Sequence, residues 1–444
     1  MSDEFPPPLP ADDAEASQVP PGVPPEGARP GLLGRVRSLA IDLSPLRESR
    51  QYRLLITGET VSDLGSQITA VAIPFQVYKL THSPLAVGLL ALCEFFPILL
   101  LPLVGGAIAD AVERRRLLRI VYGILPLLSL VLVWNARLAS PHVWVLYVFA
   151  TLSAAAYGLY SPAARSIPPL LFPKERLPSV FALQSAYYSF VALGGPAVAG
   201  VLIAVIGLPA TYAVDVVSFL VALGTLSLMR PIPRVEEGAE VSLASIREGL
   251  RFLKGRRVLQ STFTVDLNAM IFGMPTALFP AFADHLGVGP SVLGLFYAAP
   301  YAGSLGISVL SGRARNVRRQ GLAVELAVVV WGAAIAGFGL SRHVWLAVLM
   351  LAIAGAADMW SAIFRTSIGQ TLTPDAMRGR MSGIELSVVA SGPALGNLEA
   401  GVVGSLVSVP FSIVSGGLAC VVGVGVISAL VPQFRRYDAS DPTP

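Results

Sequence analysis

Apolar residues fill twelve long stretches of the chain, and short polar segments separate them. Each stretch is long enough to cross the roughly 30 Å of hydrocarbon in a bilayer as an α-helix that rises ~1.5 Å per residue. The pattern therefore predicts an all-α polytopic membrane protein with twelve transmembrane helices. The predicted spans are 54–78, 85–108, 117–136, 143–164, 180–206, 210–229, 258–281, 289–311, 321–340, 344–364, 381–407 and 411–431.

The basic residues indicate on which side of the membrane each loop lies. Of the 32 lysines and arginines, all but Lys79, Arg137 and Arg342 fall in the terminal segments or in every second gap between spans. Cytoplasmic loops carry an excess of basic residues, so this pattern places both termini in the cytoplasm. The basic loops face anionic lipid, which accounts for an isoelectric point near 9.1 without a nucleic-acid partner. A mean hydropathy of +0.67 with 14% charged residues excludes a soluble domain.

Several short motifs recur about 200 residues further along the chain. Arg165-Ser-Ile returns as Arg365-Thr-Ser-Ile, and Gly195-Pro196 returns as Gly392-Pro393. Such recurrence predicts two pseudo-repeats of six helices, an arrangement found in transporters. The predicted domains are a Pro-rich, disordered cytoplasmic tail (1–53), a first six-helix half (54–229), a cytoplasmic linker with an amphipathic helix (230–257), a second six-helix half (258–432) and a cytoplasmic tail (433–444). Within the first tail, the spacing of apolar residues in 32–46 fits either a helix on the membrane surface or a plain linker.

The loop between the second and third predicted spans combines glycine, an acid and a basic cluster. Gly106 allows two helices to approach closely, and Asp110 near a helix end can accept hydrogen bonds and pair with arginine. Together with Arg114, Arg115 and Arg116, these residues form a predicted gate segment that closes the cytoplasmic side in one state and releases it in another. The alternative is a positively charged anchor with an incidental acid.

The gate segment resembles the signature loop of the major facilitator superfamily, although Ala111 stands where an arginine is common and Glu113 where a glycine is common. Further stretches resemble the siderophore and drug exporters of that superfamily, namely 77–88, 278–284, 294–300 and 373–380. The resemblance implies the major facilitator fold and proton-driven export of an enterobactin-like siderophore or an amphipathic drug across the bacterial inner membrane. We expect the bilayer, protons and a small organic substrate as partners, and a monomeric protein.

Proline and glycine in the fifth predicted span look like the motif associated with exporters of this superfamily. Pro196 removes a backbone donor and bends the helix, while Gly195 and Gly200 permit tight packing. The motif favours export over import. Import of a small organic solute remains an alternative, as does a membrane scaffold or transceptor without transport.

Charged side chains inside the predicted spans need a reason, because they are costly in hydrocarbon. Glu59 and Asp63 are four residues apart and share a helical face. Their repulsion in low dielectric favours holding a proton near neutrality, as proton coupling requires. Alternatively, Glu59 reaches the interface and Asp63 pairs locally. Further candidates for proton coupling or for the substrate cavity are Glu94, Asp266, Asn268, Asp358 and Arg365.

Other polar and aromatic residues in the spans have simpler interpretations. Asp358 and Arg365 are two turns apart on one face, so structural pairing is an alternative for them. The acids expected at interfaces or in packing are Asp215, Glu325, Glu385 and Glu399. Candidates for an organic-substrate cavity are Tyr157, Tyr160, Tyr187, Tyr188, Tyr297 and Trp360. Aromatic residues in membrane helices more often pack in the core or at the interface.

The sequence does not indicate an enzyme. It lacks a His-Glu-x-x-His zinc motif, a Gly-x-Ser-x-Gly elbow and a phosphate-binding Gly-x-x-x-x-Gly-Lys loop. Cys93 and Cys420 both fall inside predicted spans, which indicates neither a disulfide framework nor a zinc site. We therefore expect no cofactor and no bound metal, and an ion gradient as the source of energy.

Overall fold

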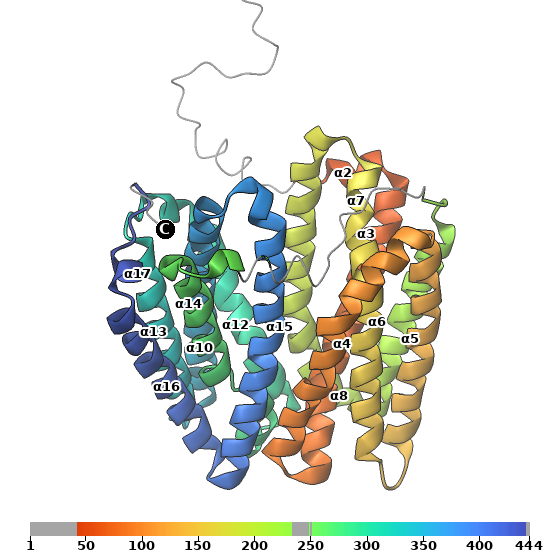
Figure 1. Ribbon diagram of the computed structural model, residues 1–444. Helices are drawn as coiled ribbons and strands as arrows, with labels where there is room; N and C mark the ends of the chain where they lie inside the picture. Colours follow the sequence, from red (N-terminus) through yellow and green to blue (C-terminus); the bar gives the residue numbers. More distant parts are fainter. Residues whose placement is uncertain (1–41, 233–247, 249–250, 441–444) are drawn as a thin grey trace, which may run out of the picture. The chain divides into compact units, whose positions relative to one another are not determined.

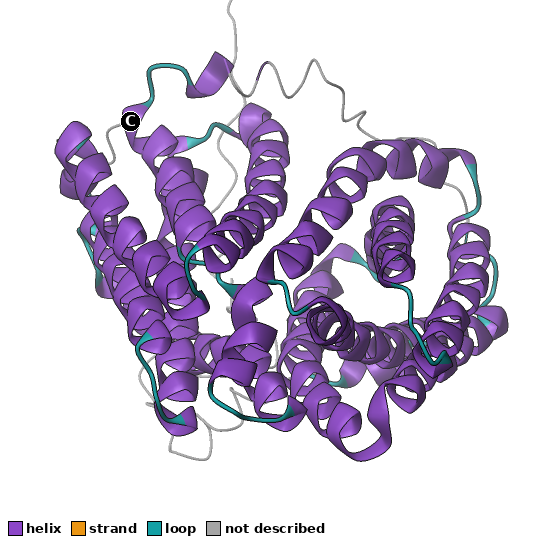
Figure 2. Ribbon diagram, turned by 90° about the horizontal axis from the view of Figure 1, so that it is seen from below, coloured by secondary structure: helices purple, strands orange, loops and turns teal. Residues whose placement is uncertain are grey.

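Long α-helices make up nearly all of the described chain, which comprises residues 42–232, 248 and 251–440 of the computed structural model. No β-strand occurs in this part, as Figure 2 shows. The residues from Leu43 onward form one compact unit. The predicted Pro-rich tail up to residue 41 and most of the predicted linker helix lie outside the described residues.

The helices and short 3-10 turns follow the predicted spans along the chain. They are α2 (Ser44–Glu48), α3 (Arg50–Thr81), α4 (Pro84–Ala111), α5 (Arg114–Arg137), α6 (Val143–Ser166), α7 (Pro168–Leu171), η1 (Lys174–Arg176), α8 (Leu177–Leu228), α10 (Arg257–Phe272), η2 (Thr276–Leu278), α11 (Phe279–His285), α12 (Pro290–Leu310), η3 (Ser311–Asn316), α13 (Gln320–Gly339), α14 (Val344–Leu372), α15 (Asp375–Leu406), α16 (Val409–Leu430) and α17 (Pro432–Arg436).

The membrane-protein class is confirmed by the length and apolarity of these helices. Ten helical segments of the described chain are long and apolar enough to cross a membrane. Helix α3 is not among them, and Lys174–Leu228 counts as one segment although its backbone is non-helical at Gly207. The number of twelve spans therefore stays a prediction.

Two breaks in the helices bear on the predicted spans. Gly207 has a φ of 74°, which glycine adopts readily, and it divides α8 where the sequence predicts a loop. The seventh predicted span, 258–281, lies within the apolar segment Arg257–His285, in which the structure ends α10 at Phe272 and inserts the turn η2 before α11. The helix is interrupted there because Pro275, just before the turn, lacks the amide hydrogen that would continue it.

Contacts divide the helices into two groups. In the first helix group, α3, α4, α5, α6 and α8 pack on one another, and in the second, α10 and α12 to α16 do so. Between the groups, α15 packs against α4 and α12 against α8; the neighbouring positions of α15 and α4 can be followed in Figure 1. This division agrees with two six-helix halves, although their boundaries stay a prediction.

Glycines let the two groups approach closely at two crossings. Where α4 crosses α15, a Cβ added to Gly88 would lie 2.6 Å from the carbonyl oxygen of Asn397. Where α8 crosses α12, a Cβ added to Gly200 would lie 2.6 Å from the carbonyl oxygen of Pro290 and 2.9 Å from the Cα of Gly294. Both separations are too short for a side chain, so each crossing requires a glycine.

Buried apolar side chains join the two groups at one end of the helices. One cluster contains Val77 and Val87 of the first group together with Phe279, Leu293 and Phe338 of the second. The other buried clusters of the described chain each lie within a single group. The joined end carries the loops that follow α3, α11 and α15, which the charge pattern predicts to lie outside the cytoplasm.

Candidate functional site

A cavity of about 510 Å³, the acidic cavity, lies among the helices of the first group. Three carboxylic acids line it, namely Asp63 of α3, Glu94 of α4 and Asp215 of α8. Other polar or aromatic lining residues are Ser66, Gln67, Thr69, Phe149, Ser153, Tyr157, Tyr160, Tyr188 and Phe219. No lysine, arginine or histidine occurs among the described residues that line it. Its volume falls within the roughly 300–1,000 Å³ typical of small-molecule sites.

Asp63 lies beside a group of tyrosines. Tyr187 donates its hydroxyl hydrogen to Oδ2 of Asp63 over 3.4 Å, and its ring stacks on Tyr188 with centroids 4.3 Å apart. Tyr157 and Tyr160, both from α6, pack edge to face with centroids 5.7 Å apart. Of the aromatic candidates in the first half, Tyr157, Tyr160 and Tyr188 therefore line the acidic cavity, while Tyr187 is buried behind it.

Glu59 and Glu94 have different surroundings. Glu59 lies one turn before Asp63 on α3, as the spacing predicts, but it is not among the residues that line the acidic cavity. Glu94 lines the cavity with an exposed side chain and accepts no hydrogen bond from the described residues. Its carboxylate is therefore free to meet a proton or a bound molecule.

Asp215 lines the acidic cavity, although the sequence did not indicate this position for it. It is only 1% exposed, and Oγ of Ser129 donates a hydrogen bond to its Oδ2 over 2.8 Å. The hydroxyls of Thr69 and Ser218 also lie close to this carboxylate. Sequence position alone suggests an interfacial or packing charge. The structure instead places Asp215 about 12 Å beyond the break at Gly207, at ~1.5 Å per residue, inside the first group.

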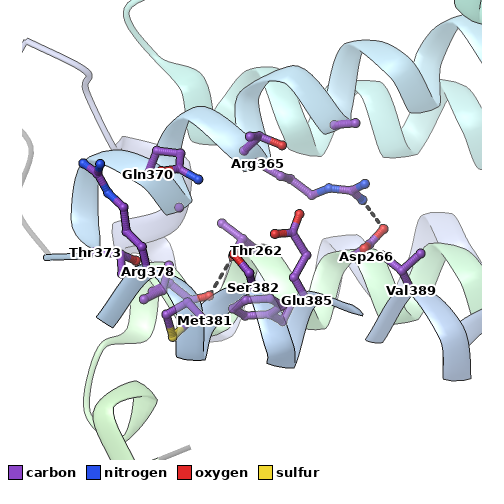
Figure 3. Close-up of a pocket in the computed structure, with 15 residues that line it drawn as sticks. Thr262, Asp266, Arg365, Gln370, Thr373, Arg378, Met381, Ser382, Glu385 and Val389 are labelled. Carbon is purple, nitrogen blue, oxygen red and sulfur yellow. Dashed lines mark hydrogen bonds and ion pairs between the residues drawn. The ribbon is translucent and has the colours of Figure 1, made fainter. Parts of the chain in front are cut away.

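A second pocket, of about 190 Å³, lies between α10, α14 and α15 (Figure 3). Arg365 donates a hydrogen bond to Asp266 across this pocket and forms an ion pair with it. The two side chains are 14% and 10% exposed, and Nη2 of Arg365 lies 3.8 Å from Oδ1 of Asp358. Figure 3 shows Glu385 of α15 beside the pair. The structure therefore brings together three candidates from the sequence, with Asp266 as the main partner of Arg365.

Two asparagines hold the interrupted seventh segment. Asn268 donates a hydrogen bond to the carbonyl oxygen of Cys420 over 2.9 Å, so it fastens α10 to α16 instead of facing either pocket described above. Oδ1 of Asn397 accepts hydrogen bonds from Oγ1 of Thr276 at 2.6 Å and from the backbone nitrogen of Ala277 at 2.8 Å. Asn397 thereby fixes the turn η2 against α15, close to the crossing with α4.

The predicted gate segment is described only in part. Helix α4 continues to Ala111, but the side chains of residues 103–111, including Gly106 and Asp110, lie outside the described ones. Arg114 is buried, whereas Arg116 is exposed. The predicted pairing of Asp110 with the basic cluster therefore stays a prediction.

Arg115 of the gate segment and the adjacent Glu113 attach the start of α5 to the end of α8 and the residues after it. Arg115 donates hydrogen bonds to the carbonyl oxygens of Leu226 at 3.0 Å and Ser227 at 2.8 Å. Glu113 accepts one from the backbone nitrogen of Ile232 over 3.3 Å. A cation that binds the last carbonyl groups of a helix is stabilised by the helix dipole. The segment thus has a structural role in addition to the predicted gating.

An acid also lies beside the basic loop that follows α12 in the second group. The backbone nitrogen of Ala439 donates to the carbonyl oxygen of Arg318 over 2.9 Å. Asp438 accepts hydrogen bonds from Ser440, and these bonds, with nearby Arg318 and Arg319, hold the pKa of Asp438 below its ordinary value. The Asp438 carboxylate, which follows α17, thus stays charged next to Arg318 and Arg319. The loop that holds these arginines corresponds to the gate segment in the predicted repeat.

The residues of the predicted exporter motif all serve close packing. A Cβ added to Gly195 would lie 2.5 Å from Cβ of Gln67, so α8 approaches α3 there. Gly200 belongs to the crossing with α12, and the carbonyl oxygen of Pro196 would lie 2.5 Å from a Cβ at Gly294. One glycine therefore packs within the first group, while the other two residues join the groups.

Metal-ligating side chains do not gather in the described part of the chain, where no group of three or more His, Cys, Asp or Glu residues could hold an ion. Cys93 and Cys420 are both free thiols. The groups available in the two pockets are carboxylates, hydroxyls, amides, two paired guanidinium groups and aromatic rings. Such groups can bind a small molecule and exchange protons.

The helical membrane fold and its acidic cavity agree with a transporter, and comparison with known proteins identifies the family. The family model described as transmembrane secretion effector matches residues 40–444. The chain therefore belongs to this family of the major facilitator superfamily, a class of transport proteins and not of enzymes.

Named relatives and solved structures are similar to this chain over most of its length. The chain is 26% identical to the enterobactin exporter EntS of Shigella flexneri and to that of Escherichia coli strain SE11 over 408 residues, 91% of this chain and 98% of each relative. A bacterial homologue of the human lysosomal transporter Spinster, in an inward-facing and unoccupied conformation, matches with a TM-score of 0.67, 16% identity and coverage of 89% and 99%. A bacterial homologue of the iron transporter ferroportin, in an inward-facing state, has a TM-score of 0.63, 17% identity and coverage of 87% and 98%. These two structures share the fold.

Proposed function

We propose that this protein exports a small organic molecule across the bacterial inner membrane in exchange for protons. The observation that carries the proposal is a cavity of about 510 Å³ with three carboxylic acids, placed among helices of a membrane protein. Acids at such depth commonly mark proton or substrate pathways. Relatives named as enterobactin exporters support the outward direction and make a siderophore or an amphipathic drug the proposed cargo.

The contacts between the helix groups support alternating access. The groups join at the end predicted to lie outside. On this proposal, the acidic cavity opens toward the cytoplasm in this conformation. Substrate enters there and is released outside. Asp63 or Glu94 then takes up protons from the outside, and the protein returns to the conformation that is open to the cytoplasm. Glu59 would influence Asp63 from the next turn of α3. The gate segment around Asp110 would close the cytoplasmic side in the opposite conformation.

Transport into inside-out membrane vesicles tests this proposal. Respiration acidifies their lumen, so an exporter that exchanges substrate for protons accumulates substrate inside, and a protonophore abolishes the accumulation. Gradient-driven uptake by right-side-out vesicles would show import instead. Absence of gradient-dependent movement in both orientations, with the protein present in the membrane, would contradict transport.

A further inference from the structure

We infer that the acidic cavity selects amphipathic organic cations. The inference rests on the proposed function and narrows its substrate, because neither a siderophore nor a generic drug implies a positive charge. Asp63, Glu94 and Asp215 approach the cavity from three different helices. A bound cation compensates these carboxylates, whereas a bound anion meets repulsion from three sides.

The surrounding charges reinforce this selection. Glu59, one turn from Asp63, adds a further acid behind the lining. Arg165, at the end of α6, donates a hydrogen bond to the hydroxyl of Tyr157 over 3.3 Å and is not among the lining residues. None of the ion pairs of the described residues includes Asp63, Glu94 or Asp215. Within the described lining of the cavity, these three acids therefore have no basic neighbour.

Burial strengthens the effect of the acids. Asp215 is only 1% exposed, and Oγ of Ser129 donates a hydrogen bond to its Oδ2 over 2.8 Å. Charges attract one another more strongly where water is excluded. A cation bound in the cavity therefore gains more from Asp215 than from an acid at the surface.

Aromatic side chains complete a site for a cation with an apolar body. Tyr157 and Tyr188 are 43% and 46% exposed, although both belong to membrane helices and line the cavity. The face of an aromatic ring attracts a cation, more strongly where water is scarce. Phe149 and Phe219 add apolar surface for the remainder of the ligand. Charge and rings thus point to one class of substrate.

Equilibrium binding of radiolabelled tetraphenylphosphonium to the full-length protein in detergent tests the inference without any gradient. Glu94→Gln should weaken this binding about tenfold, because it removes a carboxylate that has no protein partner. Glu399→Gln is the matched control: it makes the same change on α15 outside the cavity and should leave binding within about twofold. Tyr157→Phe should retain binding and Tyr157→Leu should weaken it several-fold, since only the first keeps the ring.

Enterobactin, which has no cationic group, serves as the opposing probe in the same assay. If it binds and is exported while tetraphenylphosphonium does not bind, the inference is overturned and the proposed function stands. If tetraphenylphosphonium binds in a Glu94-dependent way but never moves in vesicles, the cation site stands and the proposed function fails. Failure of both probes to bind, or equal effects of Glu94→Gln and Glu399→Gln, overturns the inference.

Discussion

Replacing Gly200 with alanine should weaken the closure between the two helix groups. The added Cβ would lie 2.6 Å from the carbonyl oxygen of Pro290 and 2.9 Å from the Cα of Gly294. Both are backbone atoms, so rotation of a side chain cannot relieve the overlap. Overpacking of this kind typically costs about 1–3 kcal/mol. If the crossing exists only in the conformation described above, the population of the opposite conformation rises by roughly 5–150-fold.

Gly194→Ala is the control for this experiment, because nothing lies within 4 Å of a Cβ added there on the same helix. The assay measures how fast an impermeant thiol reagent, added outside intact cells, labels Ile73→Cys, which lines the acidic cavity. The native thiols of Cys93 and Cys420 are first replaced by serine. Faster labelling in Gly200→Ala alone is expected. Equal rates in both variants, at equal amounts in the membrane, would refute the role assigned to the crossing.

Three further substitutions have clear expectations. Asp266→Asn should lower stability in detergent by up to about 3–5 kcal/mol, because Arg365 loses its main partner and retains the more distant Asp358. Thermal unfolding measures this loss. If Arg365→Met, combined with Asp266→Asn, does not restore stability, the explanation is contradicted. Asn397→Ala should lower the unfolding temperature, since two hydrogen-bond donors of η2 lose their acceptor, which costs about 1–3 kcal/mol of stability. Asn397→Asp keeps an acceptor oxygen and is the control. An equal loss of stability in both variants would argue against the role of these hydrogen bonds. Asp63→Asn should remove the gradient dependence of transport in vesicles without preventing insertion, and an unchanged response to a protonophore would exclude Asp63 from coupling.

Span positions could be predicted because membrane thickness fixes their length. The predicted span 117–136 lies within α5, Arg114–Arg137. The predicted span 344–364 is too short, because α14 continues to Leu372. Its last turns carry polar residues such as Gln370, which line the second pocket instead of facing lipid. Apolarity therefore marks only the part of a helix that meets the membrane core.

The direction in which each side chain points from its helix was harder to predict. Asp266 and Asn268 are two residues apart on α10, which places them on different sides of a helix with 3.6 residues per turn. One meets Arg365 and the other the backbone of Cys420, although the sequence gives both the same role. Spans that are apolar nearly all round have no polar stripe to fix their rotation. Which acid reaches a cavity is therefore decided by packing, as for Asp215.

The two glycine crossings use one arrangement twice. Gly88 and Gly294 each follow by four residues the proline that begins their helix, and each meets a glycine of the other group, Gly401 and Gly200 respectively. In a twofold homodimer, residue i of one subunit contacts residue j of the other, and j contacts i. The join between the groups has this self-complementary form. A protein of half this length would carry both surfaces needed to pair with a second copy of itself.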